Sequence, residues 1–552
     1  MKKITGRSAF LSILKSEGVT HLFGNPGTTE LPIMHALKDY PEIKYILGLQ
    51  ESIVVAMADG YSRATGKLSV CNVHVAPGLG NAMGAIYNAK FVGSPVIITA
   101  GQQEQGHGLM EPMLYGPLVQ MAEPLVKWAI EVTRLEDLPR ILRRAAKIAL
   151  APPTGPVFIS LPGDILNAEA KLDLGKPSRI QYNISPDKET LEDIKNRILQ
   201  ANNPVIISGH EIAQTDSFSE ITKFSEIIGA PVYQQTVPHG SHYPSEHKTY
   251  VGTMPRSQSE VKKILENYDL LICVGSDVLR MSVWSSTEPL PKNMSIIHIG
   301  IRDWELAKNY HTEQAILGNV KTTLLNLNKT IANNLNKKYK NNANRRIKEI
   351  EKFNWSKNKK NLTSKTLKDK DIIPITPNWL MMTLAENISN NNIVVEEALV
   401  SSRSLLNFLP FKNSKDFYGL ASGGIGWAVS GCIGVSLANN NKTIVAIIGD
   451  GSSMYAIQSI WTAAHYNLPI IYVIANNQSY RIIKERLEGF HNNTNFVGMD
   501  FNKPKIDFVK LGNSMGVESM QVSEPTELKS LFKKAFKYKK PYLIEVMVDK
   551  GY

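Results

Sequence analysis

Cysteine is scarce in this sequence, with only three in 552 residues. Cys71, Cys273 and Cys432 stand far apart among apolar residues, which predicts neither a disulfide framework nor a zinc site. No apolar run approaches the roughly 18 residues that a membrane span needs. Arg7 and Lys15 interrupt the apolar stretch near the N-terminus, unlike the core of a signal peptide. We therefore expect a cytoplasmic protein of enzyme size with no membrane partner.

Positive charge is in excess, with a formal net charge of +12. Residues 337–370 alone contribute +10, because thirteen Lys and Arg face three Asp and Glu (13 − 3). Nucleic-acid-binding segments interleave such cations with stacking aromatic residues, whereas Phe353 and Trp355 stand isolated here among Asn and Lys. This pattern indicates a solvated linker, and we expect no nucleic-acid partner.

The most informative stretch spans residues 444–479. A short apolar run ends in Gly449-Asp450-Gly451, and a helical pattern follows, for which Ser452 and Ser453 offer an N-cap. A second apolar run, 470–475, then leads to Asn476-Asn477-Gln478-Ser479. The pattern predicts a β-α-β unit in a parallel sheet.

Parallel sheets bind ligands at the carboxyl ends of their strands, where this stretch places its polar residues. Gly451 would let a phosphate approach the backbone at a helix N-terminus. Asp450 and Asn477 would offer the hard oxygen ligands that Mg²⁺ prefers. Asp and Asn also serve ordinary turns, but their pairing at this distance favours a metal-bridged diphosphate site.

This stretch resembles the thiamine diphosphate (ThDP) motif of ThDP-dependent enzymes. The resemblance implies that Mg²⁺ is held by Asp450, Asn477 and the main-chain carbonyl of Ser479. It also implies that a second glycine loop, 419–427, supports the cofactor, with Ile425 as an apolar wedge and the carbonyl of Gly423 accepting from the aminopyrimidine. The implied cofactor contacts are Glu51, Gly423, Ile425, Gly449, Asp450, Gly451, Ser452, Asn477 and Ser479.

Glu51 opens a helical pattern after a short apolar run. Taken alone it reads most simply as a first-turn acid that complements the helix dipole, worth about 0.3–1 kcal/mol. The run Ala58 to Gly66, ADGYSRATG, matches the one that follows a glutamate in ThDP enzymes. The resemblance implies that Glu51 hydrogen-bonds the aminopyrimidine ring and promotes loss of the thiazolium C2 proton.

Two further runs, GNPGTTELP from Gly24 and NVHVAPGLGNAMGA from Asn72, resemble the benzoylformate decarboxylase branch of this family. A lone histidine at a strand end is more often structural, but the resemblance gives His74 an active-site role in proton transfer. Thr28 matches a serine that orients the substrate carboxylate. Ser282 stands where the branch has a second active-site histidine, and Arg486 where it has an aromatic wall, which leaves the substrate open.

The expected fold is α/β, with three domains that each contain an open, mostly parallel sheet flanked by helices. The expected boundaries are 1–175 (pyrimidine-binding domain), 185–328 (middle domain), 329–373 (basic linker) and 374–552 (diphosphate-binding domain). Oxidases and acetolactate synthases of the family bind FAD in the middle domain. No glycine-rich phosphate loop follows its strands here, so a structural role is favoured.

The resemblance implies a ThDP- and Mg²⁺-dependent, non-oxidative 2-oxo acid decarboxylase in which an aldehyde can act as acceptor for carboligation. It further implies a homotetramer, a dimer of dimers, with active sites at the dimer interface. The alternatives are an acetolactate synthase-like carboligase, a flavin-dependent 2-oxo acid oxidase and a non-catalytic binding protein on the same fold. Intact Glu51, Asp450 and Asn477 argue against the last.

Overall fold

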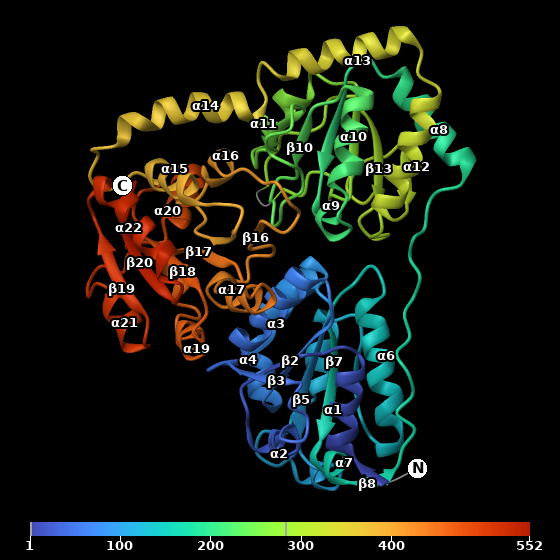
Figure 1. Ribbon diagram of the computed structural model, residues 1–552, viewed down its shortest axis with the longest axis vertical. Helices are drawn as coiled ribbons and strands as arrows, with labels where there is room; N and C mark the ends of the chain where they lie inside the picture. The colour runs from blue at the N-terminus through green and yellow to red at the C-terminus, as the bar shows by residue number, and fades with distance from the viewer. Residues whose placement is uncertain (1–2, 282–283, 552) are drawn as a thin grey trace.

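A computed structural model describes residues 3–281 and 284–551. It contains three six-stranded sheets in which every strand pairs in parallel, and helices cover both faces of each (Figure 1). Parallel sheets of this kind are buried on both faces, as the continuous apolar run of Ile444 to Ile448 requires. The predicted three-domain α/β fold is confirmed. None of the described helices combines the length and apolar character needed to cross a membrane.

The N-terminal domain is drawn in blue to cyan in Figure 1. A short antiparallel pair, β1 (Lys3–Thr5) and β8 (Glu169–Lys171), ties its first and last segments together. The strands of its sheet are β2 (His21–Gly24), β3 (Lys44–Leu47), β4 (Ser69–Val73), β5 (Val96–Gln102), β6 (Ala129–Glu131) and β7 (Val157–Pro162). Its helices are α1 (Gly6–Ser16), α2 (Leu31–Leu37), α3 (Glu51–Thr65), α4 (Val75–Val92), α5 (Leu118–Ala122), α6 (Leu138–Leu150) and α7 (Gly163–Asn167).

The middle domain, green in Figure 1, has the strand order β11-β10-β9-β12-β13-β14. In sequence terms this is 3-2-1-4-5-6, the order of dinucleotide-binding sheets. Its strands are β9 (Pro204–Ser208), β10 (Val232–Gln234), β11 (Tyr250–Thr253), β12 (Leu270–Val274), β13 (Ser295–Gly300) and β14 (Gln314–Leu317). Its helices are α8 (Lys188–Gln200), α9 (His210–Gln214), α10 (Phe218–Ile228), α11 (Gln258–Leu265) and α12 (Val320–Asn333).

The C-terminal domain, orange to red in Figure 1, has the strand order β16-β15-β17-β18-β20-β19. Its strands are β15 (Asn392–Glu397), β16 (Phe417–Gly419), β17 (Thr443–Gly449), β18 (Ile470–Asn476), β19 (Glu518–Val522) and β20 (Tyr542–Met547). Its helices are α15 (Pro377–Asn387), α16 (Leu405–Phe408), α17 (Trp427–Ala438), α18 (Asp450–Ser453), α19 (Ser459–His465), α20 (Arg481–His491), α21 (Phe508–Ser514) and α22 (Leu528–Tyr538).

The N-terminal and C-terminal sheets share one topology. Numbered within each domain, both have the order 2-1-3-4-6-5. In such sheets, ligands bind where successive connections leave in opposite directions, outside the carboxyl ends of the strands. These switch points lie between β2 and β4 in the N-terminal domain and between β15 and β17 in the C-terminal domain. The fold therefore offers two related crevices.

Helices α3 and α17 join these two domains through small residues. A Cβ atom on Gly434 would lie 1.9 Å from the carbonyl oxygen of Met57, and one on Gly60 would lie 2.1 Å from that of Gly431. Glycine at these positions lets the two backbones approach closely. Apolar residues of both domains consequently form one continuous buried cluster, which fixes their relative placement.

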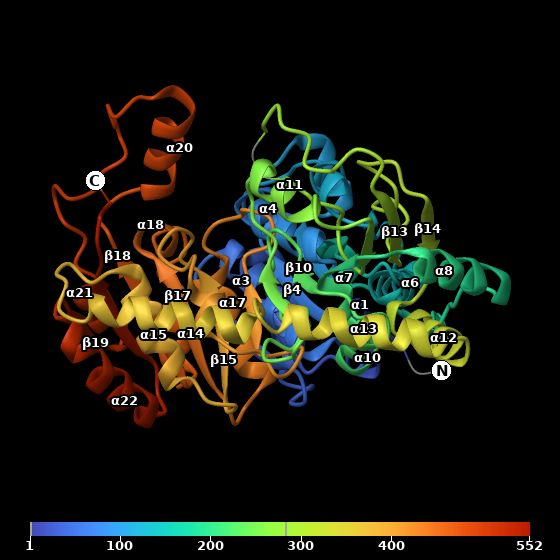
Figure 2. The same cartoon turned by 90° about the horizontal axis from the view of Figure 1, so that it is seen from above.

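The basic segment connects two domains and is mostly exposed, as a solvated linker would be, but it forms a pair of helices that the sequence analysis did not predict. Figure 2 shows α13 (Lys337–Ile350) and α14 (Trp355–Thr366) running from the middle domain to the C-terminal domain. Asn336 and Asn354 cap their N-termini through side-chain oxygens. Trp355 is only 2% exposed and donates its indole N–H to the carbonyl of Leu406 at 2.8 Å. The segment is a packed strut whose lysines face water.

Candidate active site

The predicted site residues lie at the two switch-point crevices. In the N-terminal domain, Thr28 follows β2 and His74 follows β4, and these strands are paired neighbours. In the C-terminal domain the predicted Asp450 follows β17, and Glu397, which the sequence analysis did not single out, ends the paired strand β15. The chain thus places polar residues where parallel sheets bind ligands.

Asp450 connects the ends of β17 and β18. Its Oδ1 atom accepts from the Gly451 N–H at 2.8 Å, and its Oδ2 atom accepts from the N–H groups of Asn477 (3.0 Å) and Gln478 (2.6 Å). Burial raises the pKa of this carboxyl to about 6, although these backbone hydrogen bonds act in the opposite direction. A buried carboxylate that is hard to ionise gains from a bound cation.

The three residues predicted to hold Mg²⁺ fit that role. Asp450, Asn477 and Ser479 are buried together at one edge of the sheet, and Asn477 Oδ1 accepts from the Ser479 N–H at 3.0 Å. Between them Gln478 has a φ of +58°, a left-handed conformation that costs a non-glycine residue of order 1–3 kcal/mol and that concentrates at functional sites. The donor set is carboxylate, carboxamide and carbonyl oxygen, which suits Mg²⁺.

Glu397 fixes the glycine loop before α17 through hydrogen bonds to the backbone. Its carboxylate accepts from the N–H groups of Gly426 at 2.6 Å and Ala428 at 2.7 Å, and burial raises its pKa to about 8. Gly423 has a φ of +88° with open space where a side chain would stand. Ile425 lines a cavity of about 240 Å³. An open glycine and an apolar side chain beside a cavity are compatible with the predicted roles of Gly423 and Ile425.

The same cavity brings the two domains together within one chain. Gln50 and Asn81 of the N-terminal domain line it beside Ile425 and Tyr455. Asn81 Nδ2 also donates to Glu51 Oε2 at 3.1 Å, so the residues predicted to contact the aminopyrimidine lie close to the wedge. Asp450 and Asn477 are not among the residues that line this cavity.

Glu51 does not cap its helix. The N-cap of α3 is Gln50, whose Oε1 atom accepts from the N–H of Ser52 at 2.7 Å. Glu51 is 6% exposed, and its carboxylate is gripped by two side-chain amides, Asn25 at 3.2 Å and Asn81 at 3.1 Å. Glu51 thus remains a first-turn acid of α3, and two amide donors fix its carboxylate in addition.

His74 is paired with a carboxylate that the sequence analysis did not single out. Its Nδ1 atom lies 2.7 Å from Glu30 Oε2, and Glu30 also accepts from the N–H of Gly101 at 2.8 Å. A Cβ atom on Gly27 would lie 2.0 Å from His74 Nδ1, so glycine permits the close approach. A carboxylate that holds one ring nitrogen orients the other. The next residue, Val75, has a φ of +41°, strain typical of functional turns.

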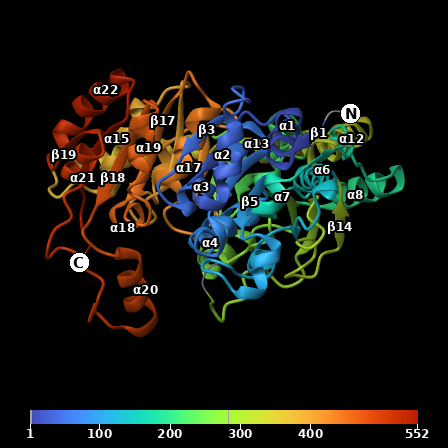
Figure 3. The ribbon, with the colours of Figure 1, turned by 90° about the horizontal axis from the view of Figure 1, so that it is seen from below.

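The remaining predicted residues have mixed outcomes. Thr28 is exposed at the start of a short 3-10 turn, Thr28–Glu30, on the rim of the N-terminal crevice. Ser282 lies outside the described residues. Arg486 lies on α20, which projects from the C-terminal domain (Figures 2 and 3), and its guanidinium lies 5.9 Å from the ring centre of Phe490.

The expected N-cap of the helix after β17 is wrong. That helix begins at Asp450, and its N-cap is Gly449, without a side-chain cap. Ser452 and Ser453 lie inside α18, where the hydroxyl of Ser453 donates back to the carbonyl of Asp450 at 2.7 Å.

Comparisons with known proteins agree with this geometry. Models of the thiamine pyrophosphate enzymes match the chain as an N-terminal TPP binding domain (4–114), a central domain (191–327) and a C-terminal TPP binding domain (401–546). Benzoylformate decarboxylase of Pseudomonas aeruginosa is 29% identical over 548 residues, 98% of each chain. The acetolactate synthase large subunit of Buchnera aphidicola is 27% identical, over 96% of this chain and 91% of its own.

A solved structure is similar throughout. The ThDP-dependent 4-hydroxybenzoylformate decarboxylase of Rhodococcus jostii matches with a TM-score of 0.87 and 28% identity, over 99% of each chain. The three family models follow one another in the order of the three domains and together cover most of the chain. This chain belongs to the thiamine pyrophosphate enzymes.

Proposed function

We propose that this protein is a carboxy-lyase, a ThDP- and Mg²⁺-dependent non-oxidative 2-oxo acid decarboxylase with carboligase activity towards aldehydes. One observation carries the proposal. The carboxylate of Glu51, which accepts hydrogen bonds from two amides, and His74, which a carboxylate orients, lie at the same switch-point crevice. The related crevice holds the oxygen donors around Asp450. ThDP, when bound, supplies the nucleophilic carbon and the electron sink for 2-oxo acid chemistry.

Residues of the chain would bind the cofactor, transfer protons and hold the substrate. Asp450, Asn477 and the carbonyl of Ser479 would hold Mg²⁺ and through it the diphosphate, beside the backbone of Gly449, Gly451 and Ser452. Glu51 would exchange a proton with the pyrimidine ring, because its carboxylate is buried and fixed. His74, oriented by Glu30, would move protons at the reacting carbon, and Thr28 would hold the substrate carboxylate.

The flavin-dependent oxidase is disfavoured by the middle domain. The loops after β9 and β12, which flank its switch point, pack directly together, because a Cβ atom on Gly209 would lie 2.3 Å from the carbonyl oxygen of Gly275. Glu211 fills the adjoining space and accepts from the N–H of Ile301 at 2.9 Å. A dinucleotide would need this crevice open.

We further propose that the active sites are shared between subunits of a dimer of dimers. Leu109, Met110 and Met113 follow β5 at the carboxyl edge of the N-terminal sheet and are strongly exposed, Leu109 at 94%. An apolar patch of this kind beside a crevice is typical of an interface. It supports assembly through this face of the N-terminal domain. Within one chain, Asp450 does not line the cavity that holds Ile425 and Asn81, and a shared site would bring Glu51 of one subunit to Asp450 of another.

The proposed activity is tested with a panel of 2-oxo acids in the presence of ThDP and Mg²⁺, scored for CO₂ and for acyloin products. Release of CO₂ with an aldehyde product supports the decarboxylase. Acetolactate formed from pyruvate as the main product would instead favour the synthase-like carboligase, to which the Buchnera relative points. Absence of turnover with every 2-oxo acid would contradict the proposal.

Glu30→Gln should lower kcat by roughly 10- to 100-fold, the range seen when a partner that orients a metal-bound histidine is lost. The glutamine keeps the shape but not the charge that faces His74 Nδ1. Affinity for ThDP should stay unchanged, because no described contact of Glu30 reaches the C-terminal crevice. Steady-state kinetics and calorimetric titration of ThDP measure the two quantities.

A matched control is Glu17→Gln, since Glu17 is also a buried N-terminal-domain carboxylate, paired with Arg143 at 2.5 Å. The control variant should keep kcat even where its stability falls. Equal losses of kcat in both variants would assign Glu30 a structural role only.

Benzoylformate should be a poorer substrate than smaller or more polar 2-oxo acids. Arg486 stands where the benzoylformate decarboxylase branch places an aromatic wall, and a guanidinium prefers a second carboxylate of the substrate to a phenyl ring. We expect kcat/KM for benzoylformate to fall below the values for pyruvate, 2-oxobutyrate and 2-oxoglutarate. Arg486→Leu should shift the ratio towards benzoylformate.

The control for this series is Arg144→Leu. Arg144 also lies over an aromatic ring, with its guanidinium 5.8 Å from the ring centre of Trp128, but on α6, away from both crevices. A preference of the parent enzyme for benzoylformate, or the same shift in both variants, would contradict the assignment of Arg486 to the substrate pocket.

A further inference from the structure

The middle domain has the strand order of a nucleotide-binding sheet, yet the edge that normally binds the ligand is closed. Gly209, Gly275 and Glu211 fill the switch point between β9 and β12, as described above. A cavity of about 720 Å³ lies at the opposite, amino-terminal edge. That volume is within the range of about 300–1,000 Å³ that small-molecule sites occupy.

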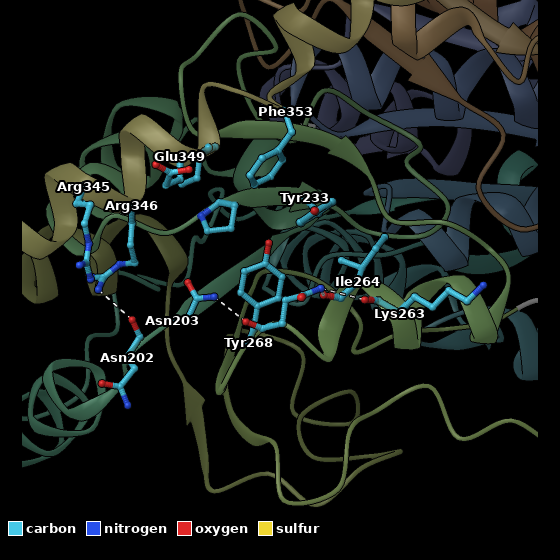
Figure 4. Close-up of a pocket in the computed structure, with 13 residues that line it drawn as sticks. Asn202, Asn203, Tyr233, Lys263, Ile264, Tyr268, Arg345, Arg346, Glu349 and Phe353 are labelled. Carbon is cyan, nitrogen blue, oxygen red and sulfur yellow. Dashed lines mark hydrogen bonds between the residues drawn. The ribbon is translucent and has the colours of Figure 1, made fainter.

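This cavity is bounded by the sheet on one side and by α11 and α13 on the others (Figure 4). Asn203 directly precedes β9, Pro231 precedes β10 and Tyr268 lies just before β12, so three neighbouring strands begin at its floor. Helix α13 belongs to the strut between the middle and C-terminal domains. The cavity therefore lies between a rigid sheet and the element that connects two domains.

Aromatic rings form one part of the lining. Tyr233 on β10, Tyr268 before β12 and Phe353 after α13 come from separate elements and converge on the cavity (Figure 4). Phe353 is 39% exposed, so its ring is uncovered on the cavity side of the strut. An exposed ring such as that of Phe353 offers a stacking surface to a planar group, and such stacking in nucleic-acid complexes is worth about 1–3 kcal/mol per base.

Two arginines form the other part. Arg345 and Arg346 lie side by side on α13 (Figure 4). Arg346 is fixed by three carbonyl oxygens, those of Ile228 (2.6 Å), Asn202 (3.0 Å) and Gly229 (3.1 Å). Within residues 3–281 and 284–551, the guanidinium of Arg345 has no hydrogen-bond or ion-pair partner.

The acid nearest in sequence does not neutralise this pair. Glu349, one turn along α13, also lines the cavity, but its carboxylate pairs with Lys352 at 2.7 Å. The cavity thus combines a partly exposed ring, that of Phe353, with the guanidinium of Arg345, which has no partner among the described residues. Guanidinium groups bind phosphate and carboxylate through paired N–H donors.

We propose that this cavity binds a small aromatic anion of mononucleotide size, with its ring against Phe353, Tyr233 and Tyr268 and its phosphate or carboxylate at Arg345 and Arg346. The occupant bridges α13 to the middle sheet. Because α14 continues the strut and is anchored on the C-terminal domain by Trp355 and Leu406, occupancy stiffens the connection between the two domains.

The test is calorimetric titration of AMP into the full-length protein saturated with ThDP and Mg²⁺, so that the diphosphate crevice is already filled. Saturable binding of one AMP per chain is expected. Adenosine carries the ring without the charge and inorganic phosphate the charge without the ring, so each should bind at least about tenfold more weakly. Phenyl phosphate distinguishes the two classes of ligand. If it binds as tightly as AMP, the cavity is a general site for aryl anions; if it binds more weakly, the cavity is a nucleotide site.

Arg345→Ala and Phe353→Ala should each weaken AMP binding by about tenfold or more. The matched control is Lys348→Ala, an exposed cation on α13 that does not line the cavity, and it should bind AMP like the parent. Absence of saturable heat with millimolar AMP and phenyl phosphate overturns the proposal. Unchanged affinity in both Arg345→Ala and Phe353→Ala overturns it equally. The titration requires no turnover, so its outcome is independent of the proposed decarboxylase activity.

Discussion

Replacing Glu51 by glutamine is expected to lower kcat by about 10²–10⁴-fold, the usual contribution of a positioned acid–base group, while ThDP still binds. Glutamine keeps the size of the side chain, but its single carbonyl oxygen can accept from only one of the amides of Asn25 and Asn81, which donate to the carboxylate at 3.2 and 3.1 Å. The other asparagine must turn its own oxygen towards the new NH2 group, and the charge and the ability to exchange a proton are lost. The rate of exchange of the ThDP C2 proton, followed by NMR, measures this step directly.

The stability of the variant separates this role from helix capping. Because Gln50 provides the N-cap of α3, Glu51→Gln should change the melting temperature little. Glu136→Gln, an exposed carboxylate of the same domain, is the control and should leave both quantities unchanged. A normal rate of proton exchange in Glu51→Gln would reduce Glu51 to a first-turn acid.

Local patterns predicted most elements but not their pairing. Helix α3 (Glu51–Thr65) is present as expected, and its C-cap Gly66 has a left-handed backbone conformation. The residues that begin and end this helix are adjacent to it in the sequence, so a local pattern could predict it. The strand orders 2-1-3-4-6-5 and 3-2-1-4-5-6 depend on contacts between residues far apart in sequence. Without them the switch points, and hence the two crevices, cannot be placed.

The same limit explains why Glu30 was missed. In the sequence it is one acid in a loop rich in glycine and proline. It becomes a partner of His74 only because β2 and β4 are neighbours in the sheet. The signal available was the close spacing of Gly24, Gly27 and Pro32 around it, which indicates a tight loop at a strand end but not which carboxylate turns inward.

For the basic strut, the amino-acid composition did not indicate that the segment forms packed helices. Lysine and asparagine dominate residues 337–370, and charge runs of this kind are usually solvated. Three apolar residues at helical spacing, Ala343, Ile347 and Ile350, are nonetheless buried, and each asparagine cap satisfies a free N–H. A narrow apolar stripe was enough to pack the helix.

Removal of the Asp450 carboxylate should have the second large effect, loss of ThDP and Mg²⁺ binding. Burial raises its pKa to about 6, so the fold disfavours the ionised form, and a metal ion that pairs with this form offsets that cost. In Asp450→Ala the metal loses its only charged ligand among the three predicted. The parent's melting temperature should rise on addition of ThDP with Mg²⁺, through binding to the folded state, and that of the variant should not.

The pH dependence of the parent follows from the same pKa. Above about pH 6 the carboxyl is ionised and available to the metal; below it, a proton competes, and the apparent affinity for Mg²⁺ should fall by up to about tenfold per pH unit. Calorimetry between pH 5 and 7.5 measures this trend. Glu545→Gln is the matched control, because Glu545 is a buried carboxylate of the same sheet that accepts from Asn476 Nδ2 at 2.6 Å. Of the three predicted ligands, Asp450 alone carries a charge that titrates in this range. The metal would therefore lie elsewhere if Mg²⁺ stabilised Asp450→Ala as much as the parent. The same conclusion would follow if the affinity of the parent for Mg²⁺ did not fall below pH 6.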